Sequence, residues 1–172
     1  MVRAISQKIC LLGDFAVGKT SLVRRFVHNL FDDRYISTIG VKVSRKTIAL
    51  AHDDVVVELN MMLWDLAGSE EFNQVRASYL RGAAGAVLVC DLTRPTTLDR
   101  VRAYADDLLA VNPEARFVLA ANKRDLTDEQ QLTEEQVKAA AADLGAACHL
   151  TSAKTGDGVE MLFRHLGHLL LV

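Results

Sequence analysis

The sequence predicts an α/β fold built on a doubly wound, mostly parallel six-stranded sheet with one antiparallel edge strand. Short apolar runs alternate with longer segments of helical periodicity along the chain. Two strand-like runs are separated only by residues 52–54, as in a hairpin, and this pair supplies the antiparallel strand. Helices separate the other strands, which calls for parallel pairing through right-handed crossovers.

The first part of the chain is expected to hold a strand, a helix and then the hairpin. The apolar run over 8–12 ends at Gly13 and indicates a strand, and a helical pattern follows over 19–29. Strand-like stretches over 41–51 and 55–64 form the two arms of the hairpin. Ligands of such a sheet bind beyond the carboxyl ends of its strands, so we expect the functional residues there.

Strands and helices are expected to alternate through the middle of the chain. The uninterrupted apolar run over 84–90 is typical of a strand buried on both faces. Apolar residues then recur at helical spacing over 98–109, which predicts one helix. A further short apolar run over 117–121 predicts the next strand.

The last part of the chain is expected to hold two helices around one strand. Residues 133–136 form a capping box at the start of a helix, and Gly145 stands where that helix should end. The run over 146–150 predicts a strand, and a period of 3.6 residues over 159–170 predicts the final helix.

Length and composition favour one domain over residues 1–172. With 20 basic and 22 acidic residues the chain has no electrostatic footprint for nucleic acid. No apolar run approaches the roughly 20 residues that span a bilayer, and the first residues do not form a signal peptide. Three cysteines, each in an apolar run, suit buried, reduced thiols. We therefore expect a cytoplasmic monomer.

The segment GDFAVGKT over 13–20 fits the phosphate-binding pattern GxxxxGK[ST] between a predicted strand and a predicted helix. Glycines let backbone N–H groups approach phosphates, while Lys19 can reach the β- and γ-phosphates and the Thr20 hydroxyl can bind Mg²⁺. A chance glycine turn before a helix is the alternative. The predicted nucleotide contacts in this segment are Gly13, Asp14, Phe15, Ala16, Val17, Gly18, Lys19, Thr20 and Ser21.

A second polar segment, WDLAG, follows the hairpin's second strand. Asp65 can hold Mg²⁺ through a water molecule, and the Gly68 N–H can approach a γ-phosphate. Taken alone, an Asp-x-x-Gly segment is more often a simple turn. Its position directly after a hydrophobic strand favours the magnesium role.

Two further polar segments, NKRD and TSAK, follow the strands predicted over 117–121 and 146–150. An aspartate such as Asp125 can accept two hydrogen bonds from the N1 and N2 edge of guanine. Adenine offers no such donor pair, so the sequence favours guanine. Each segment could separately be a polar loop, but both together downstream of a phosphate loop are not readily assigned to chance.

These residues together resemble a small GTPase of the Ras superfamily, most closely its Rab branch. The similarity covers nearly the whole chain through GDFAVGKTSL, STIG, WDLAG, RASYLRGA, LVCDLT, NKRDL and TSAK. It implies the small G domain of P-loop NTPases, with GTP or GDP and Mg²⁺ as ligands. The site residues that it implies are Thr38 on Mg²⁺ in the GTP state, Phe31 near the guanine, Tyr35 over the phosphates, and Asn122, Lys123, Asp125, Ser152, Ala153 and Lys154 around the base.

The resemblance also implies partners and a switching cycle. An effector, an exchange factor and a GTPase-activating protein should bind the switch regions over 31–41 and 66–80. Thr38 and Gly68 should contact the γ-phosphate side, so that loss of this phosphate releases both loops. The chain ends in LGHLLLV without the prenylated cysteines usual in this branch, so no direct lipid anchor is expected. The alternatives are a removed C-terminal tail, a protein that works in solution, or one that docks on a membrane-bound partner.

Two departures from the family pattern bear on hydrolysis. Ser69 stands where the family usually has the glutamine that orients the attacking water, and its hydroxyl is too short for that role. Phe15 stands in the phosphate loop where many relatives have glycine or serine, and its ring should obstruct an incoming arginine finger. With Lys19, Thr38, Gly68 and Ser69 as the expected catalytic set, we predict slow hydrolysis.

Alternatives remain open at this stage. The chain could be a GTP-locked scaffold with negligible hydrolysis, or a P-loop kinase or ATPase, although no arginine-rich lid is evident. Arg34 could swing toward the γ-phosphate, but an exposed loop position is favoured. Solvent-exposed side chains are expected at His165, His168, Arg100, Arg102, Asp106 and Asp107.

Overall fold

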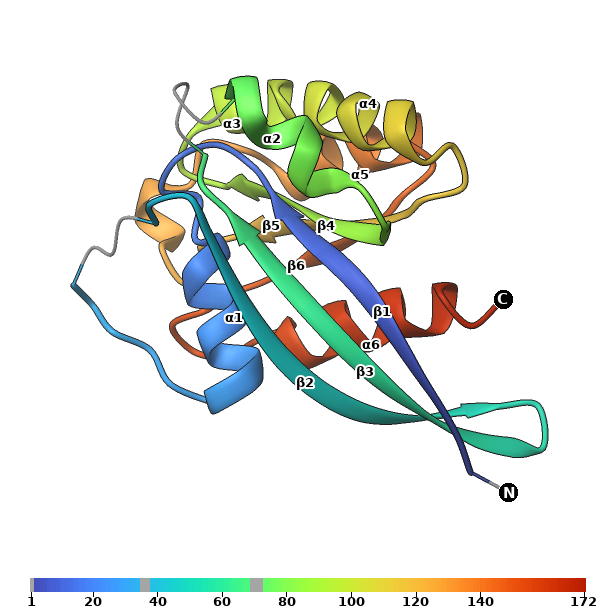
Figure 1. The fold of residues 1–172 in the computed structure, drawn as a ribbon. Coiled ribbons are helices and arrows are strands. Elements are labelled where there is room, and N and C mark those ends of the chain that lie inside the picture. The colour runs from blue at the N-terminus through green and yellow to red at the C-terminus, as the bar shows by residue number, and fades with distance from the viewer. Residues whose placement is uncertain (1, 35–37, 69–72) are drawn as a thin grey trace.

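The computed structural model of the chain describes residues 2–34, 38–68 and 73–172 (Figure 1). It contains a six-stranded sheet in the order β2-β3-β1-β4-β5-β6, in which β2 is antiparallel to β3 and the other pairs are parallel. The predicted sheet, with its one antiparallel strand at the edge, is therefore confirmed. The strands are β1 (Val2–Leu12), β2 (Val41–His52), β3 (Val55–Leu66), β4 (Ala83–Asp91), β5 (Arg116–Asn122) and β6 (Ala147–Leu150).

Helices cover both faces of the sheet, as Figure 1 shows. One face packs against α1 (Lys19–His28) and α6 (Val159–Leu169). The other face carries α2 (Asn73–Leu80), α3 (Pro95–Asp99), α4 (Val101–Val111) and α5 (Glu134–Asp143). A short 3₁₀ turn, Thr127–Glu129, follows β5.

The hydrophobic core consists of two clusters, one on each face of the sheet. Alternate residues of β1 enter different clusters, with Ile9 and Leu11 on the α1–α6 side and Cys10 and Leu12 on the other. This division is the expected result of covering a parallel sheet with helices on both faces. The two clusters hold the sheet rigid, so that the loops at its carboxyl edge have a fixed base.

Two element boundaries differ from the prediction by more than about two residues, and helix α2 was not predicted. Strand β1 begins at Val2 rather than near residue 8, because its polar first half pairs in register with β3 from Val2↔Val56 onward. The helix expected over 98–109 is divided into α3 and α4 by Arg100, with Pro95 in the first turn of α3. The spacing of apolar residues could not predict either difference. The first half of β1 is held by backbone hydrogen bonds to β3, and the break at Arg100 does not change the apolar spacing.

Local capping signals gave the correct boundaries of α5. Thr133 accepts from the Gln136 backbone N–H, and the Gln136 side chain accepts from the Thr133 N–H, which completes the capping box. Gly145 follows the helix with a φ of 65°, the left-handed conformation that glycine adopts most readily. The residues that form such caps are close together in the sequence, so these helix ends could be predicted from the sequence.

One histidine does not lie where it was expected. His168 is exposed, but His165 is partly buried, and its Nδ1 lies 2.9 Å from His149 Nε2 on β6. The prediction of a surface position for His165 is therefore wrong. Burial, reinforced by the nearby His165, lowers the pKa of His149 below its usual value of 6.5.

Acidification is expected to destabilise the chain through His149. The unfolded chain takes up a proton at His149 near pH 6.5 and the folded chain only at lower pH, so the free energy of unfolding falls as the pH drops through this window. Urea unfolding at about pH 7.5 and about pH 5.5 should show a smaller fall for His149→Gln than for the native chain. His168→Gln is the control, and a fall as large in His149→Gln as in His168→Gln would contradict this assignment.

Cysteine placement agrees with buried, reduced thiols. Cys10 and Cys90 are buried, Cys148 is partly buried, and all three are free. Burial raises the pKa of Cys10 and Cys90 to about 12, which makes their thiolates inaccessible near neutral pH. In the described ranges no helix combines the length and the apolar character needed to cross a membrane.

Candidate functional site

A pocket of about 320 Å³ lies beyond the carboxyl ends of the central strands. Loops from five separate parts of the chain form it, which is the arrangement expected of a doubly wound sheet. Most of the predicted contacts line it, namely Phe15, Ala16, Gly18, Lys19, Thr20, Ser21, Phe31, Thr38, Gly68, Asn122, Lys123, Asp125, Ala153 and Lys154. Gly13, Asp14, Val17, Asp65 and Ser152 support these residues from behind, whereas Tyr35 and Ser69 lie outside the described residues.

The phosphate-binding loop connects β1 to α1 in a shape that requires its glycines. A Cβ at Gly13 would lie 2.5 Å from the Val89 carbonyl oxygen. Gly18 has a φ of 104°, and a Cβ there would collide with the Asn122 side chain. The loop can therefore come this close to both neighbours only because these two positions carry no side chain.

Lys19 provides a buried positive charge at the centre of this loop. Its side chain is almost fully buried, and its Nζ donates to the carbonyl oxygens of Gly13 at 2.8 Å and Asp14 at 3.0 Å. Burial lowers the pKa of Lys19 to about 8, against the opposing effect of nearby carboxylates. An anionic phosphate in the pocket would compensate this poorly solvated charge.

Two hydroxyls and a carboxylate meet beside Lys19. The Thr20 hydroxyl donates to Asp65 Oδ2 at 2.5 Å, and the Thr38 hydroxyl lies 3.4 Å from the same oxygen. Burial raises the pKa of Asp65, and its other oxygen, Oδ1, is the one buried side-chain polar atom without a hydrogen-bond partner within the described ranges. Hard oxygen donors with unused capacity fit Mg²⁺, so this cluster suits the predicted metal.

The base side of the pocket is built around Asn122 at the end of β5. Asn122 donates to the Val17 carbonyl at 3.0 Å and accepts from the Thr151 hydroxyl and the Ala153 N–H. It therefore joins the phosphate loop to both base segments. Asp125 accepts from the Ser152 hydroxyl at 2.7 Å through Oδ1 alone, so the other oxygen stays available for a base.

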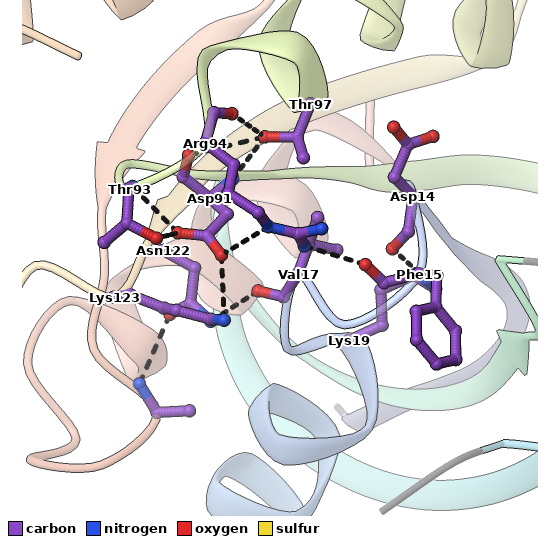
Figure 2. A network of polar contacts seen from close by, with 11 residues as sticks. Asp14, Phe15, Val17, Lys19, Asp91, Thr93, Arg94, Thr97, Asn122 and Lys123 are labelled. Atoms are coloured by element: carbon purple, nitrogen blue, oxygen red, sulfur yellow. Dashed lines mark hydrogen bonds and ion pairs between the residues drawn. The ribbon is translucent and has the colours of Figure 1, made fainter. Parts of the chain in front are cut away.

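Gly68 brings the segment after β3 into contact with the phosphate loop. A Cβ at this position would lie 2.6 Å from the Phe15 nitrogen and 2.7 Å from the Gly13 oxygen. Only glycine allows such close backbone approach. Phe15 itself is 49% exposed, and Figure 2 shows its ring pointing away from the polar groups behind the loop.

Supporting residues that the sequence did not reveal come from distant elements. Asp14 accepts from the Tyr104 hydroxyl at 2.8 Å and pairs with Arg100 at 2.9 Å, so the phosphate loop is fastened to α4. Arg25 on α1 donates to the carbonyl oxygens of Ala153 and Lys154 and fixes the second base segment. Nothing in the local sequence indicates these contacts, because the partners are about 90 to 130 positions apart.

The expected exposed helix face needs a partial correction. Asp107 is only partly exposed and pairs with Arg76, whereas Arg100 is exposed as predicted and also pairs with Asp14. Arg102 and Asp106 do form an exposed pair, as expected of a solvated face. Arg34 is exposed and paired with Asp32, which agrees with the favoured loop position.

Comparison with known proteins agrees with this arrangement. The model of the Ras family matches residues 8–171. The Ras-related protein RabJ of Dictyostelium discoideum is 35% identical over 98% of this chain, which spans 65% of the length of that relative. The Ras-related protein RABF2b of Arabidopsis thaliana is 36% identical over 98% of this chain and 82% of its own length. The GTP-binding protein ypt4 of Schizosaccharomyces pombe is 35% identical over 91% of this chain and 68% of its own length.

These matches run through both halves of the pocket, from the phosphate loop to the last base segment. The resemblance to the Rab branch is confirmed, since the three relatives carry Rab or ypt names and align with nearly the whole chain. The chain therefore belongs to the Ras family of small GTPases.

Proposed function

We propose that the chain is a guanine-nucleotide switch that binds GTP or GDP with Mg²⁺, hydrolyses GTP slowly and recruits effectors in its GTP state. The observation that carries this proposal is the convergence of three groups on one pocket. These groups are the phosphate loop, the hydroxyl–carboxylate cluster and the two base segments. One relative is named as a GTP-binding protein, which supports the choice of nucleotide.

Each part of the pocket has a proposed role. Lys19 and the N–H groups of its loop bind the phosphates, while Asp125, supported by Asn122 and Ser152, binds the guanine edge. Thr20, Thr38 and Asp65 would hold Mg²⁺, which when bound neutralises phosphate charge.

Switching follows from the position of two loops at the pocket. Thr38 and Gly68 both line it and come from the segments on either side of the β2–β3 hairpin. Loss of the γ-phosphate would remove a shared contact and release both segments. We propose that an effector, an exchange factor and a GTPase-activating protein bind regions 31–41 and 66–80 of a monomeric domain over 1–172, and that membrane recruitment depends on such partners.

Slow hydrolysis is proposed from two residues. Ser69 lacks the reach of a glutamine amide, and Phe15 places a half-exposed ring at the mouth of the pocket. A side chain that orients the attacking water accelerates hydrolysis only if it reaches that water, so a side chain that is too short loses most of this acceleration.

Nucleotide extraction from the purified chain tests the proposal. We expect bound guanine nucleotide with a retained GTP fraction, which single-turnover assays should show being converted slowly to GDP. Retention of ATP would favour the kinase or ATPase alternative. Complete retention of GTP with no turnover, alone or in cell extract, would favour the GTP-locked scaffold.

Ser69→Gln is expected to accelerate single-turnover GTP hydrolysis by at least about tenfold, because a longer amide can orient the attacking water. The dissociation rate of GDP should stay close to that of the native chain, since the substitution adds no contact to the base. Hydrolysis that is already fast in the native chain and unimproved by Ser69→Gln would sink the hypothesis of slow turnover.

A further inference from the structure

Asp91, at the end of β4, is a buried carboxylate that the proposed function does not use. Its side chain is 1% exposed, yet both of its oxygens are fully engaged. Oδ1 accepts from the Thr93 N–H at 2.8 Å and from the Thr93 hydroxyl at 2.7 Å. Oδ2 accepts from Arg94 Nε at 3.1 Å and from Lys123 Nζ at 2.8 Å (Figure 2).

One arm of this network reaches the phosphate loop. The Arg94 guanidinium donates to the Phe15 carbonyl oxygen at 2.7 Å while its Nε stays on Asp91. The backbone of Arg94 is fixed as well, because its N–H donates to the Asp91 carbonyl and its own carbonyl accepts from the Thr97 hydroxyl. Figure 2 shows the guanidinium lying between Asp91 and Phe15.

This hydrogen bond sets the direction of a backbone N–H at the pocket. The carbonyl of Phe15 belongs to the same peptide unit as the N–H of Ala16, and the two point in opposite directions across a planar trans peptide. No peptide bond of the described chain is cis, and Ala16 lines the pocket with a φ of 62°. Holding the Phe15 carbonyl on Arg94 therefore fixes the direction of the Ala16 N–H, which points away from Arg94.

The other arm reaches the base segment. Lys123 has a φ of 69°, a left-handed conformation that is unfavourable for a lysine and persists only where surrounding contacts hold it. Its ion pair with a buried carboxylate is such a contact. Burial opposes ionisation of Asp91, but hydrogen bonds from Lys123 and Thr93 outweigh it and leave its pKa below the usual value.

We propose that Asp91 and Arg94 form a brace that couples the phosphate loop to the base segment, so that both are positioning residues for nucleotide retention. A bound base would order Lys123, which restrains the Asp91 carboxylate through their ion pair. Asp91 in turn restrains the Arg94 guanidinium and, through the Phe15 carbonyl, the orientation of the Ala16 N–H. The proposal rests on the guanine-nucleotide function proposed above.

The test measures GDP dissociation and GMP affinity for the whole chain with the variant Arg94→Met. Loss of a charge-assisted hydrogen bond should speed GDP dissociation about tenfold. GMP lacks the β-phosphate and uses less of the loop, so its affinity should fall only about twofold. Arg116→Met, which removes an exposed arginine at the opposite end of β5, is the matched control and should change neither value.

Two further variants separate positioning from general loosening. Arg94→Lys can hold Asp91 or the Phe15 carbonyl but not both, so we expect an intermediate dissociation rate and an unchanged melting temperature. Asp91→Asn weakens the contacts of Asp91 with both Arg94 and Lys123. Adding Arg94→Met to Asp91→Asn should therefore raise the GDP dissociation rate by a smaller factor than Arg94→Met does in the native chain.

Three results would overturn the brace. The first is an unchanged GDP dissociation rate in Arg94→Met, and the second is a fall in GDP affinity that is no larger than the fall in GMP affinity. The third is that the effects of Asp91→Asn and Arg94→Met on the GDP dissociation rate multiply fully in the double variant. Failure of the native chain to bind GDP would instead overturn the proposed function and the brace with it. If Arg94→Met does not fold, the same measurements are made on Arg94→Lys. An unchanged GDP dissociation rate, or an equal fall in the affinities for GDP and GMP, would then overturn the brace.

Discussion

Asp125→Asn should lower the affinity of the chain for GDP about a hundred- to ten-thousandfold, because two charge-assisted hydrogen bonds from the guanine edge are lost. The asparagine oxygen can still accept from N1–H, but its NH2 group then faces the guanine N2 amino group, which is also a donor. One hydrogen bond is thereby replaced by an unfavourable contact between two donors. Xanthine offers an oxygen in place of the guanine amino group, so xanthosine diphosphate should bind Asp125→Asn better than GDP does.

Competition binding with GDP and xanthosine diphosphate measures both effects. Asp128→Asn is the matched control, because Asp128 is an exposed aspartate in the 3₁₀ turn shortly after the pocket. Its affinity for GDP should match that of the native chain. Unchanged guanine affinity in Asp125→Asn would refute the assignment of this carboxylate to the base, whatever its effect on stability.

Lys19→Met should abolish tight nucleotide binding while changing the stability of the nucleotide-free chain little. Burial already lowers the pKa of Lys19 to about 8, so the charge is held there at a cost. Methionine relieves that cost but leaves the Gly13 and Asp14 carbonyls without this donor. These opposing effects should keep the free energy of unfolding within about 1 kcal/mol of the native value.

Nucleotide affinity responds differently, because a phosphate would then enter a buried pocket without its cation. We expect GDP affinity to fall at least about a hundredfold, the loss typical of a buried charged hydrogen bond and its pairing. Titration with a fluorescent GDP analogue and urea unfolding of the stripped chain measure the two quantities. Equal losses of stability and affinity would show that Lys19 mainly maintains the fold.

The sheet, its antiparallel edge strand and most of the pocket could be predicted from the amino-acid sequence. These features depend on local patterns, such as the apolar runs of the strands and the glycines of 13–18. A parallel sheet brings the carboxyl ends of its strands together, so motifs that follow strands must meet. The pocket residues Lys19, Asn122 and Asp125 could therefore be named before their distances were known.

The residues that hold the pocket in shape could be identified only from the folded chain. Asp14 pairs with Arg100, the Phe15 carbonyl accepts from Arg94 and Asp91 pairs with Lys123, and each of these contacts joins residues that are far apart in the sequence. A polar side chain near a helix start is compatible with solvent or with burial until the chain is folded. Burial makes these contacts energetically important, because a charged group that is removed from water is strongly destabilising unless it is paired or hydrogen-bonded.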